Sequence, residues 1–338
     1  MTGLKRKLGD EAMALGFELF GIASANDPEL AAAIGHYDAW LADGNAATME
    51  YLARHRNLKA NPAALLPGFR SVVCVALCYG ARDEGVDSAK AKVSLYTRGR
   101  DYHDVMLEKL ETLGTWLERE CGARSRPFVD SSPVLDRFWA SRAGLGWVGK
   151  NTCLINRQAG SYLFLGGLLT TADLAADAPY TDHCGRCRKC IEACPTGAIR
   201  EPNAAWPAAQ NSASGGRHFI ESPRCIAYHT IENRGAIPEA VSAKMGTWIA
   251  GCDICQQVCP WNDPIHEGKT FARDNPAYGA SLVELARWSR GDFQTRLRGI
   301  AMSRMKYEGF ARNVAIGLEN SKSIGYPSKK IPKSSTVS

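Results

Sequence analysis

The 338-residue sequence lacks any apolar run long enough to cross a membrane. Its longest apolar stretch, YLFLGGLLTTADLA at residues 162–175, is too short and too rich in glycine and threonine to span a bilayer. The first residues, MTGLKRKLGDEAMALGF, also lack the apolar core of a signal peptide, because charges separate Leu4, Leu8 and Met13. We therefore expect a cytoplasmic protein with no membrane partner.

An excess of one charge is also nearly absent. The 41 Lys+Arg residues exceed the 35 Asp+Glu residues by a formal charge of only +6, which by itself does not identify a nucleic-acid-binding protein. Hydrophobic residues make up 45% and charged residues 22%, as in ordinary globular chains of two or three domains. Cysteine, in contrast, is abundant. In a reducing compartment, twelve cysteines indicate metal or redox chemistry rather than disulfides.

Four of these cysteines lie in CGRCRKCIEACP, residues 184–195. The spacing C-x2-C-x2-C-x3-C-P lets three thiolates bind one [4Fe–4S] cluster while the fourth binds a different cluster. A second motif, CDICQQVCP at residues 252–260, lacks its leading cysteine, and Cys225 can fill that position. The crossover predicts that Cys184, Cys187, Cys190 and Cys259 hold cluster one, and that Cys194, Cys225, Cys252 and Cys255 hold cluster two.

Zinc is the alternative, because thiolates bind both zinc and iron–sulfur clusters. A zinc ribbon would use Cys184, Cys187, Cys252 and Cys255, and would leave the other four motif cysteines unexplained. We therefore favour two clusters. The remaining cysteines are interpreted as small core residues, which is the commonest role of a free cysteine; they are Cys74, Cys78, Cys121 and Cys153.

The order of elements predicts an α+β fold. Within residues 1–175 we expect helices and strands in alternation, followed by the double-cluster segment at 176–265 and a helical basic region at 266–320. The expected helices cover 4–15, 28–43, 101–121 and 133–146, the expected strands cover 17–25, 71–79 and 126–130, and a hairpin is expected at 151–171. Residues 321–338 are rich in Pro, Ser and Lys, and we expect them to be disordered.

The glycine-rich stretch GLGWVGKN, residues 144–151, formally satisfies the dinucleotide fingerprint and most of a P-loop. It follows a helix instead of a strand, and Asn151 stands where a P-loop needs Ser or Thr. We therefore reject nucleotide binding. A simple turn and a cradle of N–H groups for another anionic cofactor remain the two alternatives.

Asp130, in PFVDSSPVLDR, is the candidate general acid. Ser132 is better placed to cap the helix that Pro133 is expected to open, so capping does not explain Asp130. Its apolar neighbours Phe128 and Val129 should raise the pKa of the carboxyl and keep it protonated. A protonated carboxyl is what a general acid needs near neutral pH.

Two other carboxylates have simpler explanations. Asp101, in RGRDYHDVM, precedes a helix and has Asp104 three residues on, so helix capping explains it at least as well as function does. Asp136 falls in a first helical turn, where the helix dipole stabilises a negative charge.

Five motifs in order resemble the epoxyqueuosine reductase family over about residues 45–320: GRDYH, VDSSPVLDRFWASRAGLGWVGKN, CGRCRKCIEACPTGAI, CIAYHTIENRG and GCDICQQVCPWN. Members of this family complete queuosine in the anticodon loop of tRNA. The resemblance implies a reductive-dehalogenase/nitroreductase-like cobalamin-binding catalytic domain at 1–175. It further implies a ferredoxin-like domain with two [4Fe–4S] clusters at 176–265 and a short HEAT-like, tRNA-binding region at 266–320.

The resemblance also implies site residues. Asp130 would donate a proton to the substrate, and the side chains near the corrin or the substrate would be Asp101, Tyr102, His103, Lys150 and Asn151. The corrinoid signature D-x-H-x-x-G is absent, because Met106 stands where glycine belongs. This implies cobalamin without a histidine of the protein as lower ligand. Electrons for the epoxide would come from an external low-potential donor of flavodoxin or ferredoxin type and pass through the clusters of a monomeric enzyme.

Basic residues gather near the end of the chain. Aromatic residues lie between them, a pattern that suits phosphate contacts and stacking on loop bases; the basic residues are Arg287, Arg290, Arg296, Arg298, Arg304, Lys306 and Arg312, and the aromatic ones Trp288, Phe293, Tyr307 and Phe310. A solvated amphipathic helix is the alternative. Two rival functions remain: a two-cluster electron-transfer protein without a tRNA substrate, and a reductive dehalogenase. The long first domain with Asp130 disfavours the former, and the missing export signal disfavours the latter.

Overall fold

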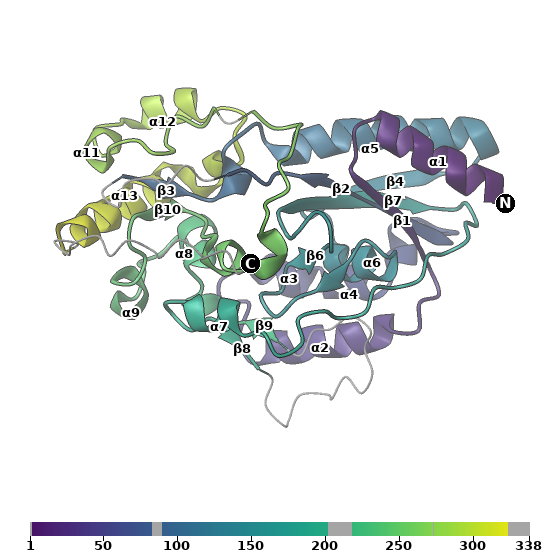
Figure 1. Ribbon diagram of the computed structural model, residues 1–338, viewed down its shortest axis with the longest axis horizontal. Coiled ribbons are helices and arrows are strands. Elements are labelled where there is room, and N and C mark those ends of the chain that lie inside the picture. The colour runs from purple at the N-terminus through teal and green to yellow at the C-terminus, as the bar shows by residue number, and fades with distance from the viewer. Residues whose placement is uncertain (1, 83–89, 202–217, 273, 324–338) are drawn as a thin grey trace, which may run out of the picture.

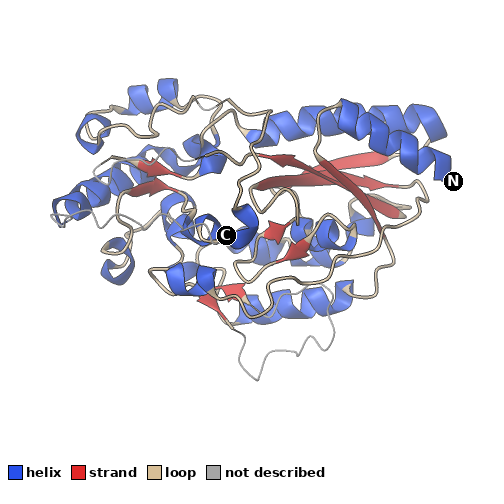
Figure 2. Cartoon of the chain, in the orientation of Figure 1, coloured by secondary structure: helices blue, strands red, loops and turns tan. Residues whose placement is uncertain are grey.

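A four-stranded sheet forms the centre of the computed structural model, which describes residues 2–82, 90–201, 218–272 and 274–323. The strand order is β1-β2-β7-β4, and all three pairings are antiparallel (Figures 1 and 2). The strands are β1 (Leu19–Ser24), β2 (Ser71–Cys78), β7 (Leu163–Thr170) and β4 (Ser125–Val129). β2 and β7 are buried along their whole length, because helices cover both faces of the sheet.

Helices form one layer on each face (Figure 1). On one side lie α1 (Thr2–Ala14) and α5 (Tyr102–Cys121), and on the other lies α6 (Asp136–Arg142), with α2 (Leu30–Ala42), α3 (Glu50–Arg54) and α4 (Arg56–Ala60) further out. Alternate residues of β2 serve the two cores, as the pleat of a strand requires. Val73 and Val75 belong to the core with α5, whereas Val72 and Ala76 belong to the core with α6.

The expected helices at 4–15, 28–43 and 101–121 are confirmed as α1, α2 and α5. The expected helix at 133–146 begins later, at Asp136. Residues 131–135 form turns in which the backbone N–H of Ser132 donates to the Val129 carbonyl at 2.8 Å. The prediction that Ser132 caps a helix opened by Pro133 is therefore wrong. Pro133 lies three residues before the first helical residue, and its ring disfavours a helical conformation at Ser132.

The hairpin expected at 151–171 is also wrong. Its first part, β6 (Leu154–Ile155), pairs with β5 (Trp147–Val148), whereas its second part, β7, enters the main sheet between β2 and β4. The apolar run of residues 162–175 is thus a central strand. A run of that composition favours burial on both faces and leaves its pairing partner undetermined.

The double-cluster segment consists of short elements: α7 (Lys189–Ala193), β8 (Ile199–Arg200), β9 (Phe219–Ile220), α8 (Ile226–Ile231), α9 (Glu239–Ser242), β10 (Trp248–Ala250) and α10 (Ile254–Gln257). The following region is helical, as expected, with α11 (Leu282–Leu285), α12 (Arg290–Arg296), the 3₁₀ helix η5 (Ala301–Met305) and α13 (Lys306–Ser323). Of the tail expected to be disordered, residues 321–323 end α13, and the rest lies outside the described residues.

The C-terminal region shares its core with an early part of the chain. β3 (Lys92–Val93) pairs in parallel with β10, and Ala91 and Val93 pack with Ile249 and with the helices at 282–314. The 3₁₀ helix η2 (Leu95–Thr97) follows β3 and leads to α5. The three predicted regions therefore do not have separate cores. No helix in the described ranges combines the length and the apolar character that a bilayer crossing needs.

Candidate functional site

Asp130 lies at the centre of a connected chain of polar side chains. It follows β4, and its Oδ1 lies 2.8 Å from Nε2 of His103, while its Oδ2 accepts a short hydrogen bond from the Tyr102 hydroxyl. His103 Nδ1 lies 2.6 Å from Oδ1 of Asp101. The same Asp101 oxygen accepts the backbone N–H of His103 at 3.1 Å and so caps α5. Arg304 Nε, in η5, lies 3.4 Å from the other Asp101 oxygen.

The two ends of this chain, Asp130 and Arg304, are exposed, and its middle is buried. The side chain of Asp130 is 45% exposed, whereas those of His103 and Asp101 are 8% and 13% exposed. The Tyr102 ring is buried and stacks on Phe164, with ring centroids 4.1 Å apart. A substrate can therefore reach the carboxylate of Asp130, while the groups behind it are fixed by packing and by the helix cap.

The charges of this chain differ from the expected ones. Burial of its inner side raises the pKa of Asp130, but hydrogen bonds from His103 and Tyr102 and the charge of His103 outweigh burial and lower it. Desolvation lowers the pKa of His103, but Asp101 and Asp130 outweigh it and raise this pKa to about 9. The prediction that apolar neighbours keep Asp130 protonated is wrong for this state. At neutral pH the shared proton is carried by His103.

A buried lysine contacts the turn that follows Asp130. Lys59, in α4, is buried, and its Nζ donates to the backbone carbonyl of Val134 at 3.3 Å. Burial lowers the pKa of Lys59. The Lys59 side chain thus links α4 to the turn at residues 131–135, which follows Asp130.

The first predicted set of cysteines lines one cavity. Cys184, Cys187, Cys190 and Cys259 lie around a space of about 330 Å³. Burial and the negative charges of the Cys184, Cys259 and Cys187 thiolates together raise the pKa of Cys190 to about 11. Four thiols from two segments of the chain thus converge. Cys259 lies with the cysteines of residues 184–190 and not with its sequence neighbours Cys252 and Cys255.

The thiols of the second predicted set also lie close to one another. Burial raises the pKa of Cys225, Cys252 and Cys255. The thiol of Cys194 further raises the pKa of Cys225 and Cys252, so Cys194 belongs with this set. Cys225 precedes α8 and Cys255 lies in α10, so two short helices present these thiols to a common centre. Both donor sets fit [4Fe–4S] clusters, which are bound by four thiolates each.

Lys150 and Asn151 lie beside the first cysteine set. Both line its cavity, and Lys150 Nζ donates to the carbonyls of Gly185 and Cys187 at 2.7 and 2.9 Å. Their place near the corrin or the substrate stays a prediction. Of the two alternatives for GLGWVGKN, the structure shows the turn, in which the backbone N–H groups of Gly149 and Thr152 donate to the carbonyls of Cys153 and Gly149 at 2.9 and 2.8 Å.

Two family models match the chain. The model described as 4Fe-4S double cluster binding domain matches residues 183–262, and the model described as Epoxyqueuosine reductase QueG, DUF1730 matches residues 59–131. Curated epoxyqueuosine reductases of Gloeobacter violaceus and Escherichia coli are 38% and 37% identical to it, over 94% and 95% of this chain and 97% and 82% of theirs. The chain belongs to the epoxyqueuosine reductase family.

Solved structures of this family have the same fold. An epoxyqueuosine reductase crystallised with an epoxyqueuosine-modified stem loop of tRNA-Tyr matches with a TM-score of 0.80 at 26% identity, over 96% of this chain and 83% of that one. A Bacillus subtilis member, whose catalytic aspartate loop is swung out of the active site, matches with a TM-score of 0.78 at 26% identity and the same coverage. The predicted α+β fold is confirmed.

The expectation that aromatic residues near the end of the chain stack on bases is wrong for three of the four. Trp288, Phe293 and Phe310 are buried at 6%, 4% and 1% exposure, in the core shared with β3 and β10. Arg312 is also structural, since its guanidinium donates to the backbone carbonyls of residues 229, 233 and 235. Aromatic residues at helical spacing indicate a packed face as readily as a base-binding one.

Sequence reasoning missed several residues around Asp130 in this family member. Arg304 was assigned to the basic region only, although it contacts Asp101. Burial, then the charge of Glu232 and then that of Asp130 raise the pKa of Tyr51 to about 12. Burial raises the pKa of Tyr96, and the charges of Asp253, Glu232 and Asp130 add to it. Neither Tyr51 nor Lys59 lies in a motif, so only contact in three dimensions could identify them.

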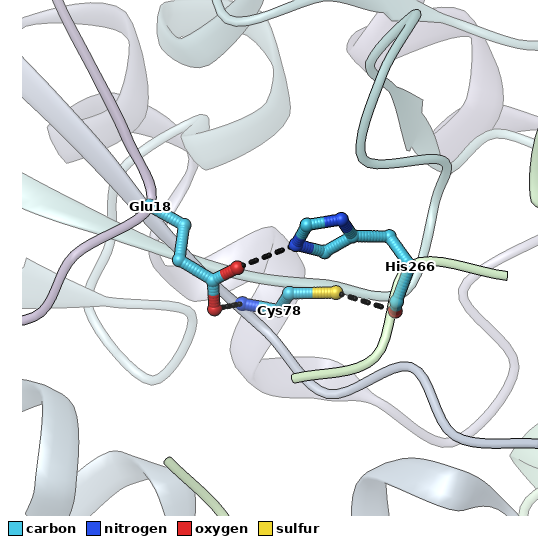
Figure 3. A group of neighbouring side chains, drawn as sticks. All are labelled: Glu18, Cys78 and His266. Atoms are coloured by element: carbon cyan, nitrogen blue, oxygen red, sulfur yellow. Dashed lines mark hydrogen bonds and ion pairs between the residues drawn. The ribbon is translucent and has the colours of Figure 1, made fainter. Parts of the chain in front are cut away.

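Two of the four cysteines predicted as core residues, Cys74 and Cys78, are buried, whereas Cys121 is exposed at the end of α5 and Cys153 is partly exposed. Cys78 joins Glu18 and His266 in a group whose ligand-type atoms lie within 4.8 Å of one another (Figure 3). Glu18 accepts the Cys78 backbone N–H at 3.0 Å and contacts His266 Nε2 at 2.8 Å, and the Cys78 thiol donates to the His266 carbonyl at 3.2 Å. Because these interactions use the ligand atoms, we interpret the group as a clamp between the sheet and the segment after residue 263.

Proposed function

We propose that this protein reduces epoxyqueuosine to queuosine at the wobble position of tRNA. Membership of the epoxyqueuosine reductase family supports the proposal, and so does the likeness to a member crystallised with an epoxyqueuosine-modified tRNA stem loop. One observation carries it: a single exposed carboxylate, Asp130, has a protonated histidine behind it, in a chain that also holds two sets of four thiols. These are the parts that a reductive removal of oxygen requires, a proton source and a path for single electrons.

The electron path would run through two [4Fe–4S] clusters. Cluster one would be held by Cys184, Cys187, Cys190 and Cys259, and cluster two by Cys194, Cys225, Cys252 and Cys255, in line with the grouping of thiol charges. Each cluster carries one electron at a time. The electrons would come from an external low-potential donor of flavodoxin or ferredoxin type, in a cytoplasmic enzyme that acts as a monomer.

We further propose cobalamin as the third cofactor, beside Asp101, Tyr102 and His103. His103 would not bind the cobalt there, because both of its ring nitrogens already contact carboxylates. Met106, at the position of the missing signature glycine, is fully buried in the core. Bound there, cobalamin would supply the low-valent metal chemistry that no side chain offers.

The protein itself would supply protons. Conversion of an epoxide to an alkene consumes two electrons and two protons and releases the oxygen as water. His103, with its pKa raised to about 9, would pass a proton to Asp130, which presents it to the departing oxygen. Tyr102 would hold Asp130 in place, and Asp101 would hold His103, while the proton moves between them. A second proton would come from solvent, also through Asp130.

The test is turnover of a tRNA stem loop that carries epoxyqueuosine, with protein purified without oxygen and supplied with cobalamin. We expect about eight iron atoms per chain from two cubane clusters, bound corrinoid, and formation of queuosine. Asp130→Asn should lose at least about a hundredfold in rate, because general acid catalysis contributes roughly 10²–10⁴. Its iron content should not change.

Asp136→Asn is the matched control, since Asp136 lies six residues away in the first turn of α6. It should keep nearly the full rate. Full iron without corrinoid binding would refute the cobalamin mechanism and favour a two-cluster electron-transfer protein. A normal rate for Asp130→Asn would refute the assigned proton donor.

A further inference from the structure

The hairpin of β5 and β6 is built around the first cysteine set, although it belongs to the catalytic part of the chain. Trp147, in β5, packs in one apolar cluster with Cys259, Cys184 and Trp261. At the hairpin turn, Lys150 binds two carbonyls of the loop that carries Cys184 and Cys187. A segment remote in sequence therefore shapes and fixes the cysteine loop.

Two buried N–H donors of this hairpin have no hydrogen-bond partner among the residues that the structure describes. Asn151 is 3% exposed and lines the cavity of the first cysteine set. Its Oδ1 accepts the backbone N–H of Cys153 at 3.2 Å, while its Nδ2 has no hydrogen-bond partner in the part of the chain that the structure describes. Such a buried donor is costly unless something absent from the polypeptide accepts it.

The second donor is the indole of Trp147, which is 0% exposed. Its Nε1 has no hydrogen-bond partner among the described residues, and its ring packs in one cluster with Cys184 and Cys259. Asn151 lines the space between the four thiols, and Trp147 packs against two of the cysteines that carry them, Cys184 and Cys259. The sulfur atoms of a cluster and of its thiolates are the acceptors that this space would contain.

The turn that presents Asn151 is strained. Thr152, a β-branched residue, has a φ of 62°, in the left-handed region that such residues rarely adopt. The conformation is held by the Gly149 carbonyl, which accepts the Thr152 N–H at 2.8 Å, and by Arg137, which donates to the Thr152 carbonyl at 2.8 Å. Strain that the surroundings enforce in this way is typical of functional sites.

We propose that the β5–β6 hairpin tunes the reduction potential of cluster one, with Asn151 and Trp147 donating N–H···S hydrogen bonds to its sulfur atoms. The inference rests on the proposed function only in requiring that Cys184, Cys187, Cys190 and Cys259 hold a [4Fe–4S] cluster.

Reduction adds one electron to the cluster and neither forms nor breaks a covalent bond. The added negative charge strengthens hydrogen bonds to sulfur, so these donors stabilise the reduced state and raise the potential. Lys150 adds a positive charge at the same rim and acts in the same direction. Asn151 and Trp147 are positioning and tuning residues and take no part in the epoxide chemistry.

The test uses the full chain with both clusters and measures the two potentials by redox titration monitored by electron paramagnetic resonance. Asn151→Asp keeps the oxygen that accepts the Cys153 N–H, and replaces the donor by a carboxylate. We expect the equilibrium constant for reduction of cluster one to fall about tenfold, which is about 59 mV for one electron. Trp147→Phe removes a donor without adding charge and should lower the same potential by less.

Cluster two is the internal control, and its potential should stay constant in both variants. Cys187→Ser identifies the signal of cluster one, because it changes a ligand of that cluster alone. An unchanged potential of cluster one in both variants would refute the inference, as would equal shifts of both clusters. Failure of the proposed function is a different result, in which the unmodified protein lacks iron or does not convert epoxyqueuosine.

Discussion

The substitution Asp101→Asn tests the role of His103 most directly, because it removes the charge of Asp101 and keeps its role as the cap of α5. Asparagine caps helices as well as aspartate does. In Asp101→Asn the amide oxygen can still accept the backbone N–H of His103 and its ring N–H, as Asp101 Oδ1 does. The negative charge beside the imidazole disappears, and with it the ion pair between Asp101 and Arg304. We therefore expect a folded enzyme whose His103 loses its proton at a lower pH than in the parent.

The magnitude follows from the pKa of His103, which is raised from 6.5 to about 9. This shift corresponds to about 3 kcal/mol in favour of the imidazolium, at roughly 1.4 kcal/mol per pKa unit. Asp101 and Asp130 share it, so removal of one charge should lower the pKa of His103 by about one unit. A raised pKa means that the proton is present below pH 9 and is lost as the pH rises through about 9.

The assay is a pH–rate profile for single turnover of epoxyqueuosine tRNA by pre-reduced enzyme. In the unmodified protein the rate should fall as the pH passes about 9. In Asp101→Asn the alkaline limb should begin about one unit lower, so that the rate at pH 8.5 is about threefold below that of the parent. At pH 6.5 the two rates should approach each other.

Asp104→Asn is the matched control, because Asp104 is an exposed residue in the first turn of the same helix. Its profile should overlay that of the parent. The reasoning would be refuted by an alkaline limb that stays in place in Asp101→Asn, or by a rate that falls equally at every pH. The latter outcome would mean that Asp101 acts through structure and not through charge.

Two further predictions concern the clusters and the sheet. Cys225→Ser removes one ligand of cluster two and should lower the iron content from about eight towards about four per chain. Cys121→Ser changes an exposed cysteine outside both sets and should leave the iron content unchanged. Iron analysis after anaerobic purification measures both, and full iron in Cys225→Ser would contradict the ligand assignment. Gly167→Ala should lower the melting temperature and destabilise the protein by about 3 kcal/mol, because a Cβ there would lie 2.0 Å from the Val73 carbonyl and 2.8 Å from the Phe128 ring. Gly3→Ala, with nothing within 4 Å, is its control, and equal melting temperatures for the two variants would argue against tight packing at β7.

Much of this molecule could be predicted from local pattern. The 3 to 4 spacing of Leu110, Leu113 and Leu117 follows from the geometry of a helix, and these residues form the buried face of α5. The cysteine spacing likewise led to two sets of thiols, because a cubane cluster allows few arrangements of short loops. Where chemistry or periodicity fixes the spacing, sequence is sufficient.

Pairings over long distances could not be predicted. Nothing local distinguishes β7 as a partner of β2 and β4, or assigns Lys150 and Asn151 to a cysteine loop more than thirty residues away. The charge of Asp130 was misjudged for the same reason. Its apolar neighbours in sequence raise its pKa, but His103 and Tyr102, which arrive from α5, decide the sign.

The short stretch of residues 94–101 has its two ends fixed in different bodies. At one end, Val93 is packed with the C-terminal helices, and at the other, Tyr102 and Met106 are packed against the main sheet. Between them lie Tyr96 and Asp101, which border the proton chain. The stretch therefore links the packing of the C-terminal helices to the position of Asp101. A shift of those helices relative to the main sheet would move Asp101 and His103, and so would change the geometry at Asp130 without a direct contact to Asp130.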